Sequence, residues 1–264
     1  MIAADLGRAA LFTSVPACYA LHVLLSAPFA VAADALSFLG SAFFLGRIRP
    51  AEPPVSEDNG SVTAGARFIA RSALVRASLV AAATLNFFVM FAALYLLYAV
   101  RVLHIRPGLV GVLIGAGAIG AVLGSLVTKR LAARIGAGWA YAAGCLLYTA
   151  PLMLWPLAHG AMPLVLAMLF AAEFVSGFGL MVLDITIGVI FAAIIPDTLR
   201  SRVTGAFQAV NYGTRLLGGL LGSVAGLRPA LWVATLGGVA GFALLLPTPL
   251  PRYRLPTVDG PARS

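Results

Sequence analysis

The feature that most constrains this chain is an apolar run from Met162 to Pro196 that contains two acidic residues. A helix of about 20 apolar residues spans the hydrocarbon core of a bilayer, so this run is long enough to cross one. Glu173 and Asp184 lie inside the run, eleven residues apart, which is about three helical turns and places them on one face. A charge in lipid is costly unless it meets a partner or water. The sequence therefore predicts a membrane helix whose acidic face points at protein or water.

Composition extends this interpretation to the whole chain. Of its 264 residues, 61% are hydrophobic and 10% are charged, whereas soluble domains have about 45–50% and about 25%. The predicted fold class is all-α, a polytopic bundle of about eight transmembrane helices. The net charge of +9 comes from basic residues that lie mostly in short loops between apolar runs. That pattern is typical of cytoplasmic membrane loops, so we predict no nucleic-acid partner.

The residues that usually carry enzyme chemistry are scattered along the chain. Cys18 and Cys145 lie in separate apolar runs, and His22, His104 and His159 have no metal-ligand spacing. Neither a Walker phosphate-binding sequence nor a GxSxG nucleophile sequence occurs. We therefore predict that the protein is not an enzyme and uses no metal and no cofactor.

Apolar segments divide the chain into spans and loops. Residues 1–45 contain two expected spans, because Ala9–Leu45 is too long for a cleaved secretion signal and has a turn near Pro28. Residues 46–78 are expected to form a cytoplasmic linker that ends in an amphipathic surface helix around Arg67. Residues 79–247 are expected to form a six-helix bundle, and residues 248–264 a cytoplasmic tail. The six spans expected in the bundle are Leu79–Val100, Leu109–Val127, Trp139–Pro156, Met162–Ile195, Thr204–Gly222 and Ala230–Leu246.

Arginines and lysines predict the orientation of these spans. If both termini are cytoplasmic, 14 of the 18 basic residues fall in cytoplasmic segments, three fall outside, and Arg215 lies within a span. Basic residues concentrate in cytoplasmic loops of membrane proteins. The sequence therefore predicts a multi-pass protein of the cell membrane with both ends inside.

Glycines four residues apart recur within the expected spans. Gly120 and Gly124 form one such pair and Gly237 and Gly241 another, and this spacing lets helix backbones approach closely in lipid. The segment 115–120 also matches the GxGxxG dinucleotide pattern, but it lies within a span and follows no strand. We interpret it as a helix-packing surface.

Several stretches resemble one family of membrane proteins. Residues 124–134, GSLVTKRLAAR, are similar to the second copy of the loop signature of the major facilitator superfamily. Arg130 and Arg134 match arginines of that signature, and Lys129 stands at its aspartate position. Residues 34–49, 95–111 and 195–203 resemble the siderophore- and drug-exporter branch. The resemblance covers residues 27–250 and implies two six-helix halves with alternating access driven by the proton gradient.

The family pattern of twelve helices is longer than this chain. The last six spans resemble helices seven to twelve, a complete second half, whereas the two spans in residues 1–45 resemble helices three and six. We therefore expect a secondary carrier that exports small amphipathic molecules in exchange for protons. The alternative is a truncated remnant that does not transport, or a membrane interaction protein that needs a second copy or a partner half to complete the bundle.

Depth within the spans selects candidates for the substrate or proton-coupling site. Glu173 and Arg215 each lie eleven residues from one end of their spans, near the midplane, where carriers bind substrate. We expect them to approach each other or to share a polar cavity, and an ion pair that only holds two helices together is the alternative. Asp34, Asn86 and Asn211 are further candidates, although interhelical hydrogen bonding is the default role of such asparagines.

A second set of charged residues lies nearer the expected cytoplasmic side. Lys129, Arg130, Arg134 and Asp184 are candidates for a cytoplasmic gate in which opposite charges pair across the bundle. Basic anchors at the membrane surface and a solvated acid explain the same residues without a gate. The expected partners of the protein are the lipid bilayer, a small-molecule substrate and protons.

Overall fold

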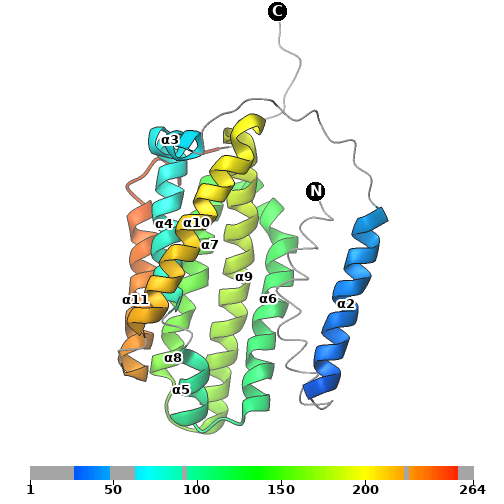
Figure 1. Cartoon of the computed structure of the whole chain (residues 1–264). Coiled ribbons are helices and arrows are strands. Elements are labelled where there is room, and N and C mark those ends of the chain that lie inside the picture. Colours follow the sequence, from blue (N-terminus) through cyan, green and yellow to red (C-terminus); the bar gives the residue numbers. More distant parts are fainter. Residues whose placement is uncertain (1–26, 48–62, 91–93, 223–225, 255–264) are drawn as a thin grey trace, which may run out of the picture.

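The fold is helical throughout the part of the chain that the computed structural model describes, which is residues 27–47, 63–90, 94–222 and 226–254. The predicted all-α class is therefore confirmed. Figure 1 shows a bundle of roughly parallel and antiparallel helices with α2 standing at one side. The elements are α2 (Ala27–Arg47), α3 (Thr63–Arg71), α4 (Ala73–Val89), α5 (Tyr95–Arg101), α6 (Pro107–Ile135), α7 (Ala137–Thr149), the 3₁₀ helix η2 (Ala150–Met153), α8 (Leu154–Leu157), α9 (Met162–Ile194), α10 (Asp197–Gly222) and α11 (Leu227–Leu245).

Four helical segments are long and apolar enough to cross a membrane among the described residues: α6, α7 continued through η2 and α8, α9, and α11. A fifth is the pair α3 and α4, which is bent by 101°. The helix α10 has 26 residues but is more polar, since it contains Asn211 and Arg215. The expected first span lies outside the described residues.

The predicted span Leu79–Val100 is not a single helix. Helix α4 ends at Val89 and α5 begins at Tyr95, so the apolar segment is divided into a long and a short helix. The predicted span Trp139–Pro156 is likewise divided, because α7 passes into η2 where Pro151 removes a backbone donor. Uniform hydropathy gave no sign of the first break, whereas Pro151 was an available sign of the second.

Local sequence explains where the long helices begin and end. Prolines occupy the first turns of α6 and α9, where the missing N–H has no helical partner to lose. Helix α6 ends at Gly136, whose φ of 89° is a conformation that favours glycine. The chain then reverses directly into α7.

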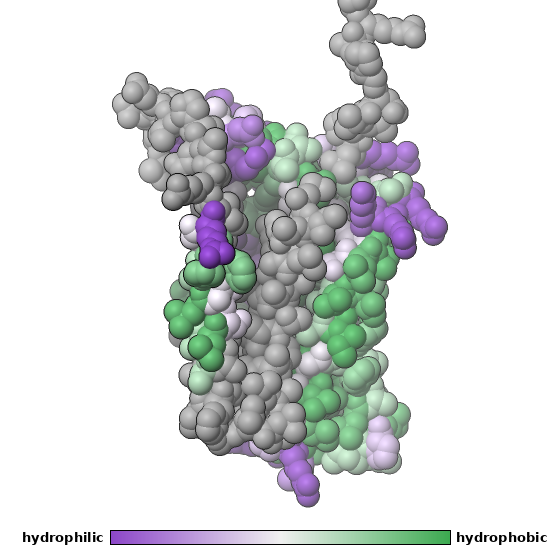
Figure 2. Space-filling view, turned by 90° about the vertical axis from the view of Figure 1, so that its right-hand side faces the viewer, coloured by the Kyte–Doolittle hydropathy of each residue, from purple (hydrophilic) through white to green (hydrophobic). Residues whose placement is uncertain are grey.

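The surface is apolar around the middle of the bundle and polar at its ends. Figure 2 shows a hydrophobic band on this face, with hydrophilic residues gathered at the top and fewer at the bottom. Large apolar side chains such as Val112, Ile119 and Leu126 on α6 are more than half exposed. Such exposure would be costly in water and is expected of a helix that faces lipid.

The helices α6 and α9 cross at backbone contact. A Cβ at Gly124 would lie 2.6 Å from the carbonyl oxygen of Phe178, and a Cβ at Gly120 would overlap the carbonyl of Phe174. Gly177 of α9 faces Gly117 of α6 in the same way. The prediction that the glycine spacing of α6 serves helix packing is therefore confirmed, and the GxGxxG pattern is part of this crossing.

Other helix pairs also approach each other closely at glycines. A Cβ at Gly144 of α7 would come within 2.6 Å of the backbone nitrogen of Leu183 on α9. A Cβ at Gly237 of α11 would overlap the ring of Phe88 on α4. Lipid supplies no hydrophobic driving force between helices, so close packing at small residues provides the attraction instead.

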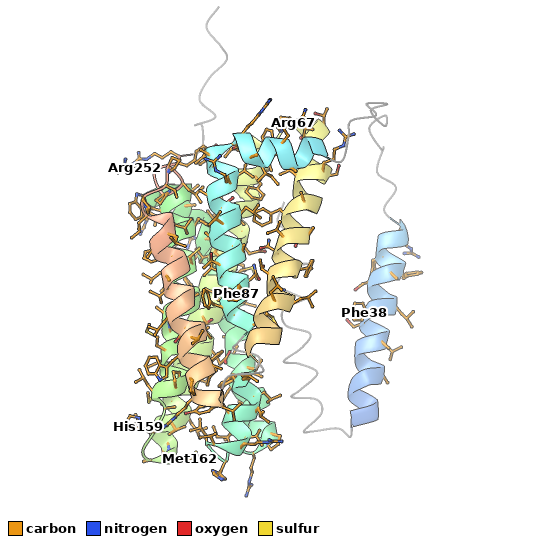
Figure 3. The ribbon with its side chains drawn as sticks, turned by 60° about the vertical axis from the view of Figure 1, so that its left-hand side comes forward. Phe38, Arg67, Phe87, His159, Met162 and Arg252 are labelled. Carbon is orange, nitrogen blue, oxygen red and sulfur yellow. The ribbon has the colours of Figure 1, made fainter. Side chains whose placement is uncertain are left out.

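Helix α3 lies across one end of the bundle. Figure 3 shows it perpendicular to α4, with Arg67 projecting away from the bundle. Its inner face packs Ile69 with Ile195 and Val203 in one buried cluster. A Cβ at Gly65 would lie 2.7 Å from the backbone of Arg202, so α3 rests directly on the start of α10.

The crossing of α6 and α9 predicts an effect of a single methyl group. We expect Gly120→Ala to lower the free energy of unfolding by about 1–3 kcal/mol, because the new Cβ displaces the Phe174 carbonyl. Denaturation of the purified protein by sodium dodecyl sulfate in mixed micelles measures this change. Gly205→Ala is the control, since nothing lies within 4 Å of a Cβ there. We expect it to leave stability unchanged or raise it by up to about 1 kcal/mol; equal effects of the two variants would contradict the packing.

Candidate functional site

Glu173 lies near the middle of α9, at the crossing with α6. Its side chain is partly buried, and its Oε2 lies 3.6 Å from the position that a Cβ of Gly117 would occupy. Within the described part of the chain the carboxylate forms no ion pair. A Cβ at position 117 would also lie 3.3 Å from the backbone oxygen of Glu173, so Gly117 lies against both the backbone and the side chain of this residue.

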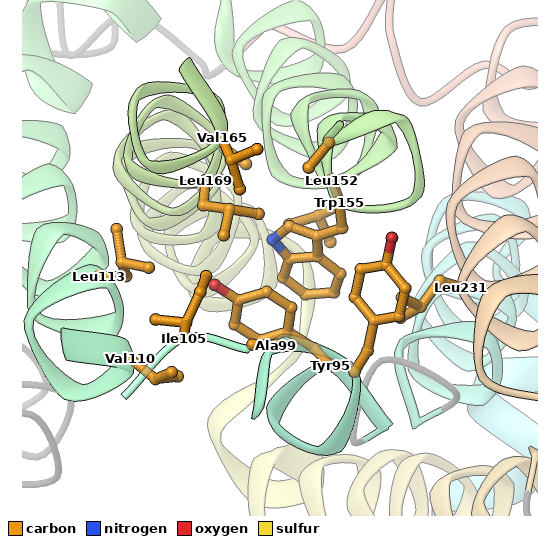
Figure 4. Packing of buried hydrophobic residues seen from close by; sticks show 13 residues of the cluster. Tyr95, Ala99, Ile105, Val110, Leu113, Leu152, Trp155, Val165, Leu169 and Leu231 are labelled. Atoms are coloured by element: carbon orange, nitrogen blue, oxygen red, sulfur yellow. The ribbon is translucent and has the colours of Figure 1, made fainter. Parts of the chain in front are cut away.

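A pair of stacked aromatic rings lies beside Glu173. The rings of Tyr95 on α5 and Trp155 on α8 have centroids 4.2 Å apart and planes inclined by 14°. The indole N–H of Trp155 is next to the Glu173 carboxylate, and the Tyr95 phenol is within its electrostatic range. Both aromatic side chains belong to a buried cluster that includes Leu169, and Figure 4 shows Trp155 packed among these residues.

Helix α7 supplies the next neighbour of the acid. The Ser176 hydroxyl, one turn beyond Glu173 on α9, donates a hydrogen bond of 2.7 Å to the Tyr148 carbonyl. This bond holds α7 against α9 close to the carboxylate. A Cβ at Gly179 would also collide with the backbone of Tyr148, so the two helices are in contact over at least one turn.

A second polar group joins α4 to α10. Arg215 Nε donates to Asn86 Oδ1 at 2.6 Å, and Asn86 Nδ2 donates to Asn211 Oδ1 at 3.1 Å. Asn211 is buried, whereas Arg215 is exposed. The three residues therefore form one hydrogen-bonded network, in which the amide of Asn86 accepts from the guanidinium and donates to the amide of Asn211.

The two polar groups do not meet as a direct ion pair. We expected Glu173 and Arg215 to approach each other or to share a cavity. The Nε of Arg215 bonds to Asn86 and the carboxylate lies beside Trp155, so the approach of the two residues or a cavity shared by them stays a prediction. Tyr148 on α7 is within electrostatic range of both charged groups.

Comparison with known proteins identifies the family. The family model described as Major Facilitator Superfamily matches residues 77–262, which is more than half of the chain. The chain belongs to the major facilitator superfamily. It is therefore a membrane transporter by family, and the match includes both polar groups described above. No curated protein and no solved structure matches the chain.

The candidate gate residues of this superfamily member are spread along one end of the bundle. Lys129, Arg130 and Arg134 are all exposed in the last two turns of α6. Asp184 is half-buried on α9 and lies within electrostatic range of Tyr141 on α7. A gate formed by these residues stays a prediction. Asp34 lies in α2, and its side chain falls outside the described residues.

Sequence reasoning missed the aromatic neighbours of the acid. Tyr95 and Trp155 are separated by sixty residues and stand near the ends of apolar segments, where such rings are common at membrane interfaces. The sequence contained one sign of this aromatic pair. Trp155 stands between Leu154 and Pro156, which places an indole at a helix break. The contact itself depends on how α5 and α8 pack against α9.

The hydrogen-bond network of α4 and α10 predicts a loss of stability. We expect Asn86→Ala to lower the free energy of unfolding by about 0.6–2 kcal/mol, because Arg215 and Asn211 both lose a partner. Thr84→Ala is the matched control on the same helix, since its hydroxyl bonds only to the Val80 carbonyl of that helix. Unfolding in mixed micelles measures the free energy of both variants. A loss of stability in Asn86→Ala that is no greater than the loss in Thr84→Ala would contradict the network.

Proposed function

We propose that the protein is a proton-coupled exporter of small amphipathic molecules and that Glu173 is the acid that couples proton binding to transport. The observation that carries the proposal is a carboxylate in the middle of a membrane helix with no cationic partner among the described residues. An acid held in a permanent ion pair would keep its charge. Glu173 instead lies beside two neutral groups, the Trp155 indole and the Tyr95 phenol, so its charge is able to change during a transport cycle.

The surroundings of Glu173 support an amphipathic cargo. Tyr95, Trp155 and Leu169 form an apolar and aromatic wall on one side of the carboxylate. Asn86, Asn211 and Arg215 form a polar network, and Tyr148 is within electrostatic range of both its guanidinium and the Glu173 carboxylate. Binding sites for small molecules combine such apolar walls with a few placed polar groups. Carriers place these sites near the middle of the membrane, which fits the depth of Glu173 in α9.

The direction of transport rests on the distribution of basic residues. Lys129, Arg130 and Arg134 are exposed at the end of the bundle where Arg67 of α3 also points outward. The concentration of arginine and lysine in cytoplasmic loops supports the assignment of this end to the cytoplasm of a cell-membrane protein. The α5 and α8 end then faces outside, and protons that enter there would drive cargo outward.

A second candidate is a half-transporter that functions as a pair of identical chains. Arg215 is exposed within α10, and Tyr212 and Leu216 beside it are 59% and 72% exposed. A guanidinium is costly against lipid, which favours a face of α10 turned toward water or protein. A second copy of the chain placed against this face would enclose the network of Arg215 and Asn86 between two bundles.

Transport by purified protein in lipid vesicles tests the leading proposal. Vesicles that contain only this chain should move a fluorescent amphipathic dye when a pH gradient is imposed. We expect Glu173→Gln to reduce the pH-driven flux to that of protein-free vesicles, because the amide cannot take up a proton. Asp197→Asn is the control, since that acid is 86% exposed and paired with Arg200. Unchanged pH-driven flux in Glu173→Gln would contradict the coupling role.

Cross-linking separates the two candidates. Tyr212→Cys, introduced with Cys18 and Cys145 replaced by serine, should form disulfide-linked dimers in the membrane if α10 of two copies meet. Val112→Cys on the exposed face of α6 is the control. Dimers specific to position 212 support the paired chain, whereas flux from monomeric protein without such dimers supports a single chain.

A further inference from the structure

Two buried polar atoms beside Glu173 lack hydrogen-bond partners. The hydroxyl of Tyr95 and the indole nitrogen of Trp155 have no partner among the described residues, and each side chain is only 5% exposed. A buried donor that is left unpaired costs about 1–3 kcal/mol, so proteins seldom keep one without a use. Here two such donors lie in one stacked pair, next to one carboxylate.

Both donors lie near the same acid. The indole N–H lies next to the Glu173 carboxylate but outside the geometry of a hydrogen bond. The Tyr95 phenol is stacked on that indole and is within electrostatic range of the carboxylate. Gly117 of α6 also lies beside the carboxylate, since a Cβ there would be 3.6 Å from Oε2.

The other neighbours of Glu173 do not replace these donors. Helix α6 presents the backbone around Gly117, and α7 presents the Tyr148 phenol, which is neutral at ordinary pH. Arg215 on α10 is a cation within electrostatic range of Tyr148, and its Nε is already bonded to Asn86. An ionised Glu173 therefore depends on Tyr95 and Trp155 for direct hydrogen bonds.

We propose that Tyr95 and Trp155 are positioning residues that hold the ionised carboxylate of Glu173 through the Oη and Nε1 donors and release it when it binds a proton. Hydrogen bonds to an ionised acceptor are roughly twice as strong as those to a neutral one. A proton that binds one carboxylate oxygen therefore weakens both bonds at once. The inference rests on the proposed function, because it assigns a control of the same coupling acid.

The release has a mechanical consequence at one end of the bundle. Tyr95 and Trp155 come from α5 and α8, which have seven and four residues. These two short helices pack with α9 and α11 in the cluster around Leu169 and Leu231. Proton binding at Glu173 loosens their attachment to α9, and this end of the bundle is then able to open.

Fluorescence of Trp155 tests the proposal without any transport assay. The chain has three tryptophans, so replacing Trp139 and Trp232 by phenylalanine leaves Trp155 as the single reporter in the full-length protein. Indole emission responds to charge and hydrogen bonding at its N–H. We expect its intensity and wavelength to change with pH in one transition, and Glu173→Gln to abolish that transition. The same pH dependence in Glu173→Gln, or constant emission in the single-tryptophan protein, would overturn the proposal.

A matched pair of tyrosine variants tests the role of the phenol. Tyr95→Phe removes one donor to the ionised acid and should move the midpoint of the transition to higher pH by about 1 unit. Tyr98 lies on the same helix and is also buried, and Tyr98→Phe loses only the bond from Arg228 Nε to the hydroxyl. It should leave the midpoint unchanged. Equal shifts in both variants would show a general effect of packing and would overturn the assignment of Tyr95.

Transport and fluorescence together separate this inference from the proposed function. A Glu173-dependent change in Trp155 emission without pH-driven flux would support the positioning residues and contradict the transport role. Flux that requires Glu173, together with Trp155 emission that does not depend on Glu173, would contradict only the assignment of the positioning residues. Circular dichroism and gel filtration of each variant confirm that the helical fold and the size of the particle are retained.

Discussion

The backbone crossing of α6 and α9 at Gly117, Gly120 and Gly124 is the contact on which the rest of the structure depends. In lipid, helices gain little from apolar burial against each other, so close backbone approach must supply the attraction. The same crossing places the Glu173 carboxylate against a residue with no side chain. Packing and chemistry therefore meet at one position, because a Cβ at position 117 would lie 3.3 Å from the backbone oxygen of the acidic residue itself.

The bundle contains two polar groups, one around Glu173 and one around Arg215. The acid on α9 has aromatic donors from α5 and α8, whereas Arg215 on α10 is held by the amide of Asn86 from α4. Tyr148 lies within electrostatic range of both charges. An acid kept apart from the nearest cation is free to change its protonation state, whereas a cation held by amides keeps its charge. This difference suits the acid to coupling and the arginine to holding helices or cargo.

Much of this arrangement was predictable from the sequence, but the contacts between distant helices were not. The helical class, the packing role of Gly120 and the family followed from composition, spacing and the signature around Arg130. The break after Val89 was missed because hydropathy is uniform across it. The partner of Arg215 was missed because it depends on the rotation of α10 against α4, which no local pattern encodes. The stacking of Tyr95 on Trp155 likewise arises only when two short helices meet α9.

The central claim is that Glu173 exchanges protons with water while it lies inside the bundle. Infrared difference spectroscopy of the purified protein tests this most directly, because a protonated carboxyl group has its own carbonyl stretching band. A band that grows as the pH falls, and is missing from Glu173→Gln but kept in Asp197→Asn, is the result that this account predicts. Identical spectra for the native protein and Glu173→Gln across the pH range would contradict it.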